Sequence, residues 1–121
     1  MNEPKALLLL LRQPPYRSSQ PLEALDIALV ARAFELPVSV LFEGAGVWQL
    51  AQGQDGSALG TRTLGEALTS LPQYDIDAVY VCAESLVTAG LTTADLVLPV
   101  QLLSRAEQRA LIVRHDVVVN D

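Results

Sequence analysis

Short apolar runs alternate with helix-like segments along the whole chain. The first run, Ala6 to Leu11, is uninterrupted and lies between Lys5 and Arg12. Its length is typical of a strand buried on both faces of a parallel sheet, and it is far too short to span a bilayer. No small-residue cleavage pattern follows it, which argues against a signal segment. We therefore predict a strand at residues 6–11.

A helix is predicted to begin near Pro21, because Pro14 and Pro15 exclude a helix before it and Ser18 or Ser19 can cap it. Apolar residues then recur at helical spacing, while polar residues stay outside the stripe. The predicted apolar face comprises Leu22, Leu25, Leu29 and Ala33, widened by Ile27, Val30 and Phe34, and the polar face carries Glu23, Asp26 and Arg32. We expect this amphipathic helix to lie on a sheet.

The rest of the pattern predicts further strands and helices in alternation. Strands are expected at 36–42, 77–82, 96–100 and 117–119, with Pro99 confining the fourth to an edge or a strand end. Helices are expected at 64–71, at 83–89 with Gly90 closing it, and from the Ser104/Glu107 capping box to about Arg114. A short helical patch is expected at 46–52, followed by a glycine-rich polar loop at 53–63.

This order predicts an α/β fold: a three-layer sandwich with a mostly parallel, about five-stranded sheet and helices on both faces. A chain of 121 residues is long enough for one ordinary domain, so we expect a single domain over residues 1–121. In such sheets, ligands and reactive groups gather at the carboxyl ends of the strands.

Composition narrows the functional classes. Half of the residues are hydrophobic and the mean hydropathy is +0.31, so some apolar surface is expected to be covered by other subunits. The formal net charge of -6 disfavours direct binding of nucleic acid, which needs a basic face. A single cysteine cannot form an internal disulfide, and the chain is therefore expected in the cytoplasm, away from the membrane.

Cys82, in "AVYVCAESL", lies where the predicted strand 77–82 meets the predicted helix 83–89. Backbone N–H groups at such a turn stabilise a thiolate, which could accept or pass on a sulfur atom. A free cysteine is, however, commonly a small buried hydrophobe. No histidine or lysine is near in sequence, and Glu84 would oppose a thiolate if it pointed inward. The local residues favour a packing role for Cys82.

Other candidate groups are sparse. His115 could pair with Cys82 only if the fold joined them, and a histidine after a helix more commonly contacts the helix's terminal carbonyls. One cysteine and one histidine make no zinc site, and no metal is expected. The glycine-rich stretches complete no phosphate-binding motif, so no cofactor is expected. Arg12 and Arg17 could bind an anion, although solvated loop arginines are the ordinary case; a self-assembling nucleotide- or anion-binding module stays an alternative.

Trp48 is the chain's only tryptophan, and with Val47 and Leu50 it forms an apolar group beside a glycine-rich turn. Packing in the core explains such a group. Tryptophan is also enriched in interface hot spots, so these three residues are candidate interface residues as well. The sequence leaves both interpretations open.

The segments "EGAGVWQL", "YDIDAVYVCAESLVTAGL" and "HDVVVND" resemble the TusC/DsrF family of sulfur-relay proteins. The likeness covers nearly the whole chain and falls on Glu43, Gly46, Val47, Trp48, Gln49 and Leu50, on Tyr74, Asp75 and Ile76, on Val81, Cys82, Ser85 and Leu86, and on Asp116 to Val118. The chain departs from the family pattern in "PLEALD", in "TAGL" and at His115, which stands in place of tyrosine.

The resemblance implies a DsrE-like fold and a C subunit assembled with B- and D-type sister subunits, two copies of each in a heterohexamer. Such a complex passes persulfide sulfur from upstream donors toward the enzyme that makes 2-thiouridine at the tRNA wobble position, or serves sulfur oxidation in the Dsr branch. The sister D or E subunit usually carries the sulfur. The resemblance thus implies a mainly structural, non-catalytic subunit; the alternative is that Cys82 is itself a persulfide-carrying sulfurtransferase residue.

Overall fold

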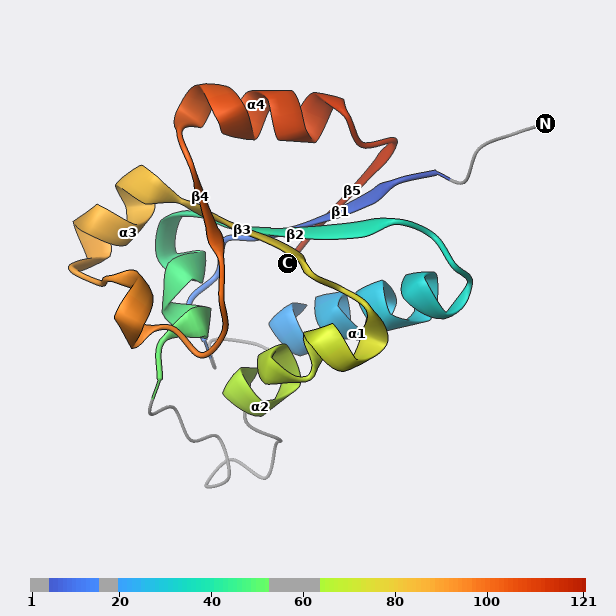
Figure 1. The fold of residues 1–121 in the computed structure, drawn as a ribbon, viewed down its shortest axis with the longest axis horizontal. Coiled ribbons are helices and arrows are strands. Elements are labelled where there is room, and N and C mark those ends of the chain that lie inside the picture. Colours follow the sequence, from blue (N-terminus) through green and yellow to red (C-terminus); the bar gives the residue numbers. More distant parts are fainter. Residues whose placement is uncertain (1–4, 16–19, 53–63) are drawn as a thin grey trace.

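The computed structural model describes residues 5–15, 20–52 and 64–121. Its centre is a five-stranded sheet in the order β4-β3-β2-β1-β5, and every neighbouring pair of strands is parallel (Figure 1). The strands are β1 (Leu7–Leu11), β2 (Val38–Phe42), β3 (Ala78–Cys82), β4 (Gln101–Leu103) and β5 (Val117–Asn120). The predicted α/β fold with a parallel sheet is confirmed. The expected loop at 53–63 and the Ser18/Ser19 cap lie outside the described residues.

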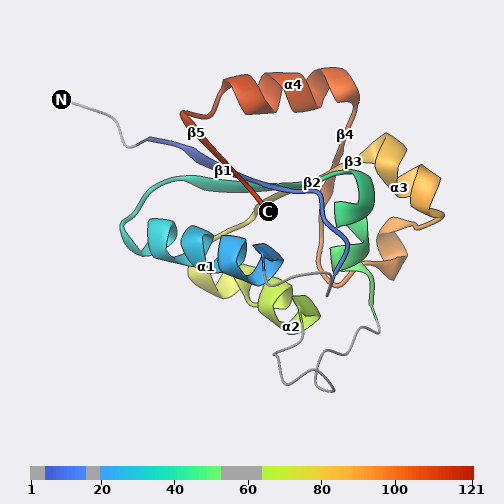
Figure 2. The same ribbon diagram turned by 180° about the vertical axis from the view of Figure 1, so that it is seen from behind.

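Helices cover both faces of this sheet and make the predicted three layers. The helical elements are α1 (Gln20–Ala33), η1 (Gly44–Leu50), α2 (Leu64–Thr69), η3 (Leu71–Tyr74), α3 (Ala83–Ala89), η4 (Thr93–Asp95) and α4 (Arg105–Val113). Helix α4 lies on one face, and α1 and α2 lie on the other (Figures 1 and 2). The predicted helix 64–71 ends earlier, at Thr69, and a separate 3-10 turn begins at Leu71, with Pro72 in its first turn.

Strand β1 supplies leucines to the cores on both faces of the sheet. Leu7, Leu9 and Leu11 pack in the larger cluster, which includes residues of α1 and α2, and Leu8 and Leu10 pack with Leu111 of α4. All five leucines are buried, because successive side chains of a strand point to opposite faces and both faces are covered. The interpretation of residues 6–11 as a strand buried on both faces is confirmed.

Helix α1 packs on the sheet through part of the predicted face, since Leu25 is buried and Leu22 and Leu29 pack partly buried against the core. Its buried residues are Pro21, Ala24, Leu25 and Ala28. The side chains predicted to widen the apolar stripe face outward: Ile27 is 47%, Val30 58% and Phe34 77% exposed. Small alanine side chains let the helix backbone approach the sheet closely, and this packing turns the larger apolar residues away. That part of the prediction was wrong.

The strand predicted at 96–100 was also misplaced. Leu96 forms an isolated antiparallel bridge with Ala51, and the N–H of Val97 donates to the carbonyl of Leu50 at 2.8 Å. The segment therefore bonds to the end of η1, and the edge strand β4 begins only at Gln101, after Pro99. The Ser104/Glu107 capping box at the start of α4 is confirmed, with both reciprocal hydrogen bonds present.

Two aspartates secure the two ends of β1. The Oδ2 atom of Asp116 accepts a hydrogen bond from the N–H of Ala6 at 2.8 Å. Beyond the other end of the strand, the Asp121 carboxylate accepts from the N–H of Arg12 and from the side-chain amide of Gln49, each at 2.8 Å. The acidic residues that flank β5 thus bond to backbone and side-chain groups around β1.

Candidate site around Cys82

Cys82 is the last residue of β3 and the N-cap of α3, as the sequence predicted. Its Sγ atom accepts a hydrogen bond from the backbone N–H of Ser85 at 3.4 Å. This bond satisfies one of the backbone donors that the first turn of a helix leaves without an intrahelical partner. The residue is only 2% exposed, and the thiol is free. Cys82 therefore fills a structural position that needs its side chain to point inward.

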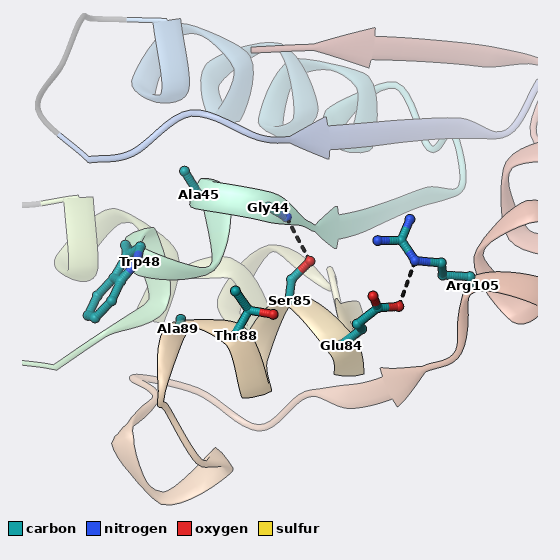
Figure 3. A pocket seen from close by; sticks show the side chains of 8 residues that line it. All are labelled: Gly44, Ala45, Trp48, Glu84, Ser85, Thr88, Ala89 and Arg105. Atoms are coloured by element: carbon teal, nitrogen blue, oxygen red, sulfur yellow. Dashed lines mark hydrogen bonds and ion pairs between the residues drawn. The ribbon is translucent and has the colours of Figure 1, made fainter.

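The hydroxyl of Ser85 links the ends of β2 and β3. Its Oγ atom accepts a hydrogen bond from the N–H of Gly44 at 2.9 Å (Figure 3). The Ser85 side chain also hydrogen-bonds to Cys82. Gly44 has a φ of 55°, a left-handed conformation that glycine adopts without a steric penalty. The serine of the motif Val-Cys-x-x-Ser-Leu thus joins two neighbouring turns at the carboxyl edge of the sheet.

The environment of Cys82 has opposing effects on its acidity. Burial raises the pKa of the thiol, because it disfavours the charged form. Hydrogen bonds from the side chain and backbone of Ser85, the side chain of Gln108 and the backbone of Glu84 stabilise the thiolate, and together they lower the pKa below its ordinary value of 9.0. The site therefore holds a buried thiol that is more acidic than a free cysteine.

Gln108 of α4 is a neighbour of Cys82 that sequence reasoning did not find. Its side chain is buried, and its Nε2 donates to the carbonyl of Leu103 at 3.3 Å. Leu103 is the residue of β4 that pairs with Cys82 in the sheet register. Twenty-six positions separate Gln108 from Cys82 (108 − 82), so only the pairing of β3 with β4 brings them together.

A pocket of about 490 Å³ opens beside this turn (Figure 3). It is lined by Gly44, Ala45, Trp48, Glu84, Ser85, Thr88, Ala89 and Arg105. The Trp48 ring stands at one end and the ion pair of Glu84 with Arg105 at the other. The buried thiol is not among the side chains that line the pocket in the described part of the chain.

Glu84 points toward Arg105, not inward toward the thiol. The Nε atom of Arg105 donates to Oε2 of Glu84 at 2.6 Å, and both side chains are largely exposed. The hydrogen bond to Arg105 and its positive charge lower the pKa of Glu84, and the same bond raises the pKa of Arg105. The charge of Arg105 also interacts favourably with Cys82. The repulsion that an inward Glu84 would exert on a thiolate is therefore avoided.

The three candidate interface residues separate into two environments. Val47 and Leu50 are fully buried in the larger core cluster, whereas Trp48 is 42% exposed on the pocket wall. The core-packing interpretation thus applies to the first two, and of the three only Trp48 presents its side chain at the surface. Gly46 lets this turn pack closely against β1 because it has no side chain. A Cβ atom at this position would stand 2.0 Å from the carbonyl oxygen of Leu11.

His115 lies at the opposite end of the sheet from Cys82. Its Nδ1 is hydrogen-bonded to the carbonyl of Leu111 at 2.7 Å, and its Nε2 to Oγ of Ser39 at 3.0 Å. Ser39 pairs with Ala78, the first residue of β3, while Cys82 is the last. The expected contact with a terminal helix carbonyl is confirmed, and no pairing of His115 with Cys82 occurs.

Among the described residues, the other candidate groups do not gather into a site. Arg12 forms an ion pair with Glu43 at the carboxyl ends of β1 and β2, and Arg17 lies outside the described residues. Within residues 5–15, 20–52 and 64–121, no three His, Cys, Asp or Glu side chains are grouped so as to hold a metal ion. None of the helices in those same ranges is long and apolar enough to cross a membrane.

The sequence matches a known family and several known proteins over most of its length. The model of the DsrE/DsrF-like family matches residues 5–120. The chain belongs to the DsrE/DsrF-like family. It is 41% identical to a protein TusC homolog of Pseudomonas aeruginosa, over 95% of this chain and 97% of that protein. It is 38% identical to the intracellular sulfur oxidation protein DsrF of Allochromatium vinosum, over 77% of this chain and 68% of that protein. The resemblance to TusC/DsrF sulfur-relay proteins is thereby confirmed.

Solved structures confirm the DsrE-like fold. The ychN protein of E. coli superposes with a TM-score of 0.82 and covers 98% of this chain and 100% of its own, at 19% identity. MTH1491 of Methanobacterium thermoautotrophicum superposes with a TM-score of 0.67 at 13% identity, over 98% of this chain and 100% of that one. At these identities the likeness concerns the fold alone.

Proposed function

We propose that this chain is a mainly structural subunit of a multi-subunit sulfur-relay complex that passes persulfide sulfur toward 2-thiolation of the tRNA wobble uridine. Membership of the TusC/DsrF family supports the sulfur-relay role. The single observation that carries the structural role is the burial of Cys82. A carrier thiol has to meet the persulfide of another protein, whereas this thiol is 2% exposed and caps α3.

The proposed partners are B- and D-type sister subunits, with two copies of each chain in a heterohexamer. The exposed Trp48 on the pocket wall is the proposed contact, because a large aromatic side chain at a pocket edge is a typical interface anchor. The high mean hydropathy of the chain also supports burial of surface against other subunits.

Co-expression with B- and D-type candidates, followed by light scattering on the purified material, tests this assembly. We expect the three chains to co-purify with the mass of a heterohexamer. Trp48→Ala should weaken retention of this chain, while Val113→Ala, which changes an exposed valine at the distant end of α4, should not. Failure to co-purify at any ratio of the three chains would exclude the proposal.

The tRNA branch is favoured over sulfur oxidation because the TusC homolog matches over 97% of its length, against 68% for DsrF. Deleting the gene in the source organism and measuring 2-thiouridine in its tRNA tests this choice. We expect the thiolated fraction to fall and to return when the chain is supplied again. Unchanged tRNA together with a loss of sulfur oxidation would assign the chain to the Dsr branch.

The lowered pKa of Cys82 supports a second candidate, in which this residue carries the sulfur itself. The Cys82 thiolate would attack the terminal sulfur of a donor persulfide, forming a new S–S bond. The donor's S–S bond would break and its own sulfur would leave as a thiolate, so no oxidant or reductant is needed. In that case Cys82→Ser would abolish 2-thiouridine formation, whereas a structural subunit would keep it.

A further inference from the structure

In the part of the chain that the structure describes, no strand pairs with the outer edge of β5. Strand β5 pairs with β1 alone and is the last strand of the sheet among the described residues. The N–H groups of Val117 and Asp121 donate to the carbonyls of Ala6 and Leu10. Because backbone groups of alternate residues in a parallel strand point to the same side, those of Val118 and Asn120 point away from β1. This edge can accept another strand.

Side chains of β5 are exposed on both faces of the sheet. Val117 pairs with Leu7, which faces the α1 layer, and Val118 pairs with Leu8, which faces the α4 layer. Val117 is 40% and Val118 36% exposed. A helix laid on one face could cover only one of these valines. An added strand with its own flanking layers would cover both, so the exposure pattern favours extension of the sheet.

Edge strands are usually protected from pairing by charged side chains, prolines or bulges. Residues Val117–Asn120 contain neither a charge nor a proline. The carboxylates of the nearest acidic residues, Asp116 and Asp121, hydrogen-bond to groups around β1. At the other edge of the sheet, β4 has three residues and follows Pro99 closely. Of the two edges, β5 is therefore the one open to pairing.

The outer side of α1 continues this surface. Helix α1 lies against β1, with α2 beside it, and β5 lies beyond β1 on the side away from β2 (Figure 2). Leu29 and Ala33 face η3, where they line a pocket with Tyr74. Ile27 and Phe34, at i and i+7 on the opposite side of the helix, are the exposed apolar residues described above.

We propose that β5 pairs antiparallel with β5 of a second copy of this chain, across a two-fold axis perpendicular to the sheet. In this register Val118 of each copy exchanges backbone hydrogen bonds with Asn120 of the other, and Val119 lies at the axis. The axis keeps both α1 helices on the same face, so their outer sides meet over the paired strands. A second copy fits because the strand is uncharged and the pairing is self-complementary, despite the net charge of -6 on each chain.

Sedimentation equilibrium of the purified chain tests this pairing. We expect a mass twice the 13.0 kDa of the chain. Val118→Pro should return the mass to that of one chain. The N–H of Val118 points away from β1, so a proline at this position leaves the pairing of β5 with β1 intact but removes a hydrogen-bond donor from the dimer contact. Val118→Lys should raise the dimer dissociation constant by more than about tenfold, because it places two like charges on the same face of the paired strands, one on each side of the axis.

Leu102→Lys on the opposite edge is the matched control, because Leu102 is 44% exposed in β4. It should leave the dimer intact, and far-ultraviolet circular dichroism should show that every variant is folded. A wild-type chain that stays monomeric at its highest soluble concentration overturns the proposal. So does a dimer that survives both changes at Val118, one that Leu102→Lys disrupts equally, or an edge that pairs only with a different protein.

Discussion

The Sγ atom of Cys82 accepts a hydrogen bond from the backbone N–H of Ser85 at 3.4 Å, so the chain's only thiol caps the first turn of α3. The side-chain hydroxyl of the same serine accepts a hydrogen bond from the N–H of Gly44. A thiol that completes the hydrogen bonding of its own turn is held inside the fold. Cys82 looks reactive in the sequence, but its hydrogen bond to the first turn of α3 explains why a cysteine lies at this position.

Replacing Cys82 should cost stability through the loss of this cap. We expect Cys82→Ala to lower the free energy of unfolding by about 1 kcal/mol, because the N–H of Ser85 loses its acceptor. Cys82→Ser keeps an acceptor at the N-cap and should lose less. Urea titration of the three proteins measures the difference. An alanine variant as stable as the wild type would show that the thiol does not support the helix.

The lowered pKa of Cys82 predicts a pH dependence of stability. Since the pKa in the fold lies below the ordinary value of 9.0, ionisation of the thiol favours the folded state. This contribution grows as the pH rises from the lowered pKa toward 9.0, is fully present above 9.0, and is lost as the pH falls through the lowered pKa. Unfolding measured across that range should show the rise in wild type and not in Cys82→Ala. Equal slopes would contradict the assignment.

Ser85→Ala should raise the pKa of Cys82, because it removes the side-chain hydrogen bond that stabilises the thiolate. Titration of the thiolate by its ultraviolet absorbance measures the shift. Thr88→Ala is the matched control, since Thr88 lies one turn later on the same helix, lines the same pocket and is not a cause of the Cys82 shift. If the two variants titrate alike, Ser85 does not set the acidity of the thiol.

Gly46→Ala should be the most damaging of the glycine substitutions in this turn. The added Cβ would stand 2.0 Å from the Leu11 carbonyl oxygen, a backbone atom that cannot move without displacing β1. We expect a loss of roughly 3 kcal/mol or more in the free energy of unfolding. Gly44→Ala, whose Cβ would meet no atom but whose φ is 55°, should lose only about 1 kcal/mol. Equal losses would contradict the close approach of η1 to β1.

The bond between Asp121 and Gln49 should couple the chain's last described residue to the turn that bears Trp48. A double-mutant cycle with Asp121→Ala and Gln49→Ala measures the coupling in the free energy of unfolding. We expect about 1 kcal/mol, because the bond is partly buried and charge-assisted. Strict additivity of the two losses would show that the two side chains act independently.

Local patterns in the sequence predicted the features that depend on neighbouring residues. The apolar run of β1, the capping box of Ser104 with Glu107, and the placement of Cys82 before a helix closed by Gly90 were all correct. Each depends on side-chain alternation, on a cap three residues away or on a left-handed glycine, and none needs knowledge of the tertiary structure.

Features that depend on distant parts of the chain could not be predicted in this way. Periodicity counted Phe34 as part of the packing face of α1, but alanines determined which face met the sheet. The N–H of Val97 bonds to the carbonyl of Leu50, so the segment predicted as a strand lies against η1, and the edge strand begins only after Pro99. The approach of Gln108 to Cys82 requires the pairing of β3 with β4. Sequence spacing carries no signal for these contacts.

We expect Cys82 to support the fold of a relay subunit and not to carry the sulfur. The most direct test supplies the assembled complex of B, C and D subunits with a cysteine desulfurase and cysteine, and then measures peptide masses. We expect an added sulfur atom on the D-type subunit and none on the peptide that contains Cys82. An added sulfur on the Cys82 peptide, to the same extent as on the D-type subunit, would contradict it.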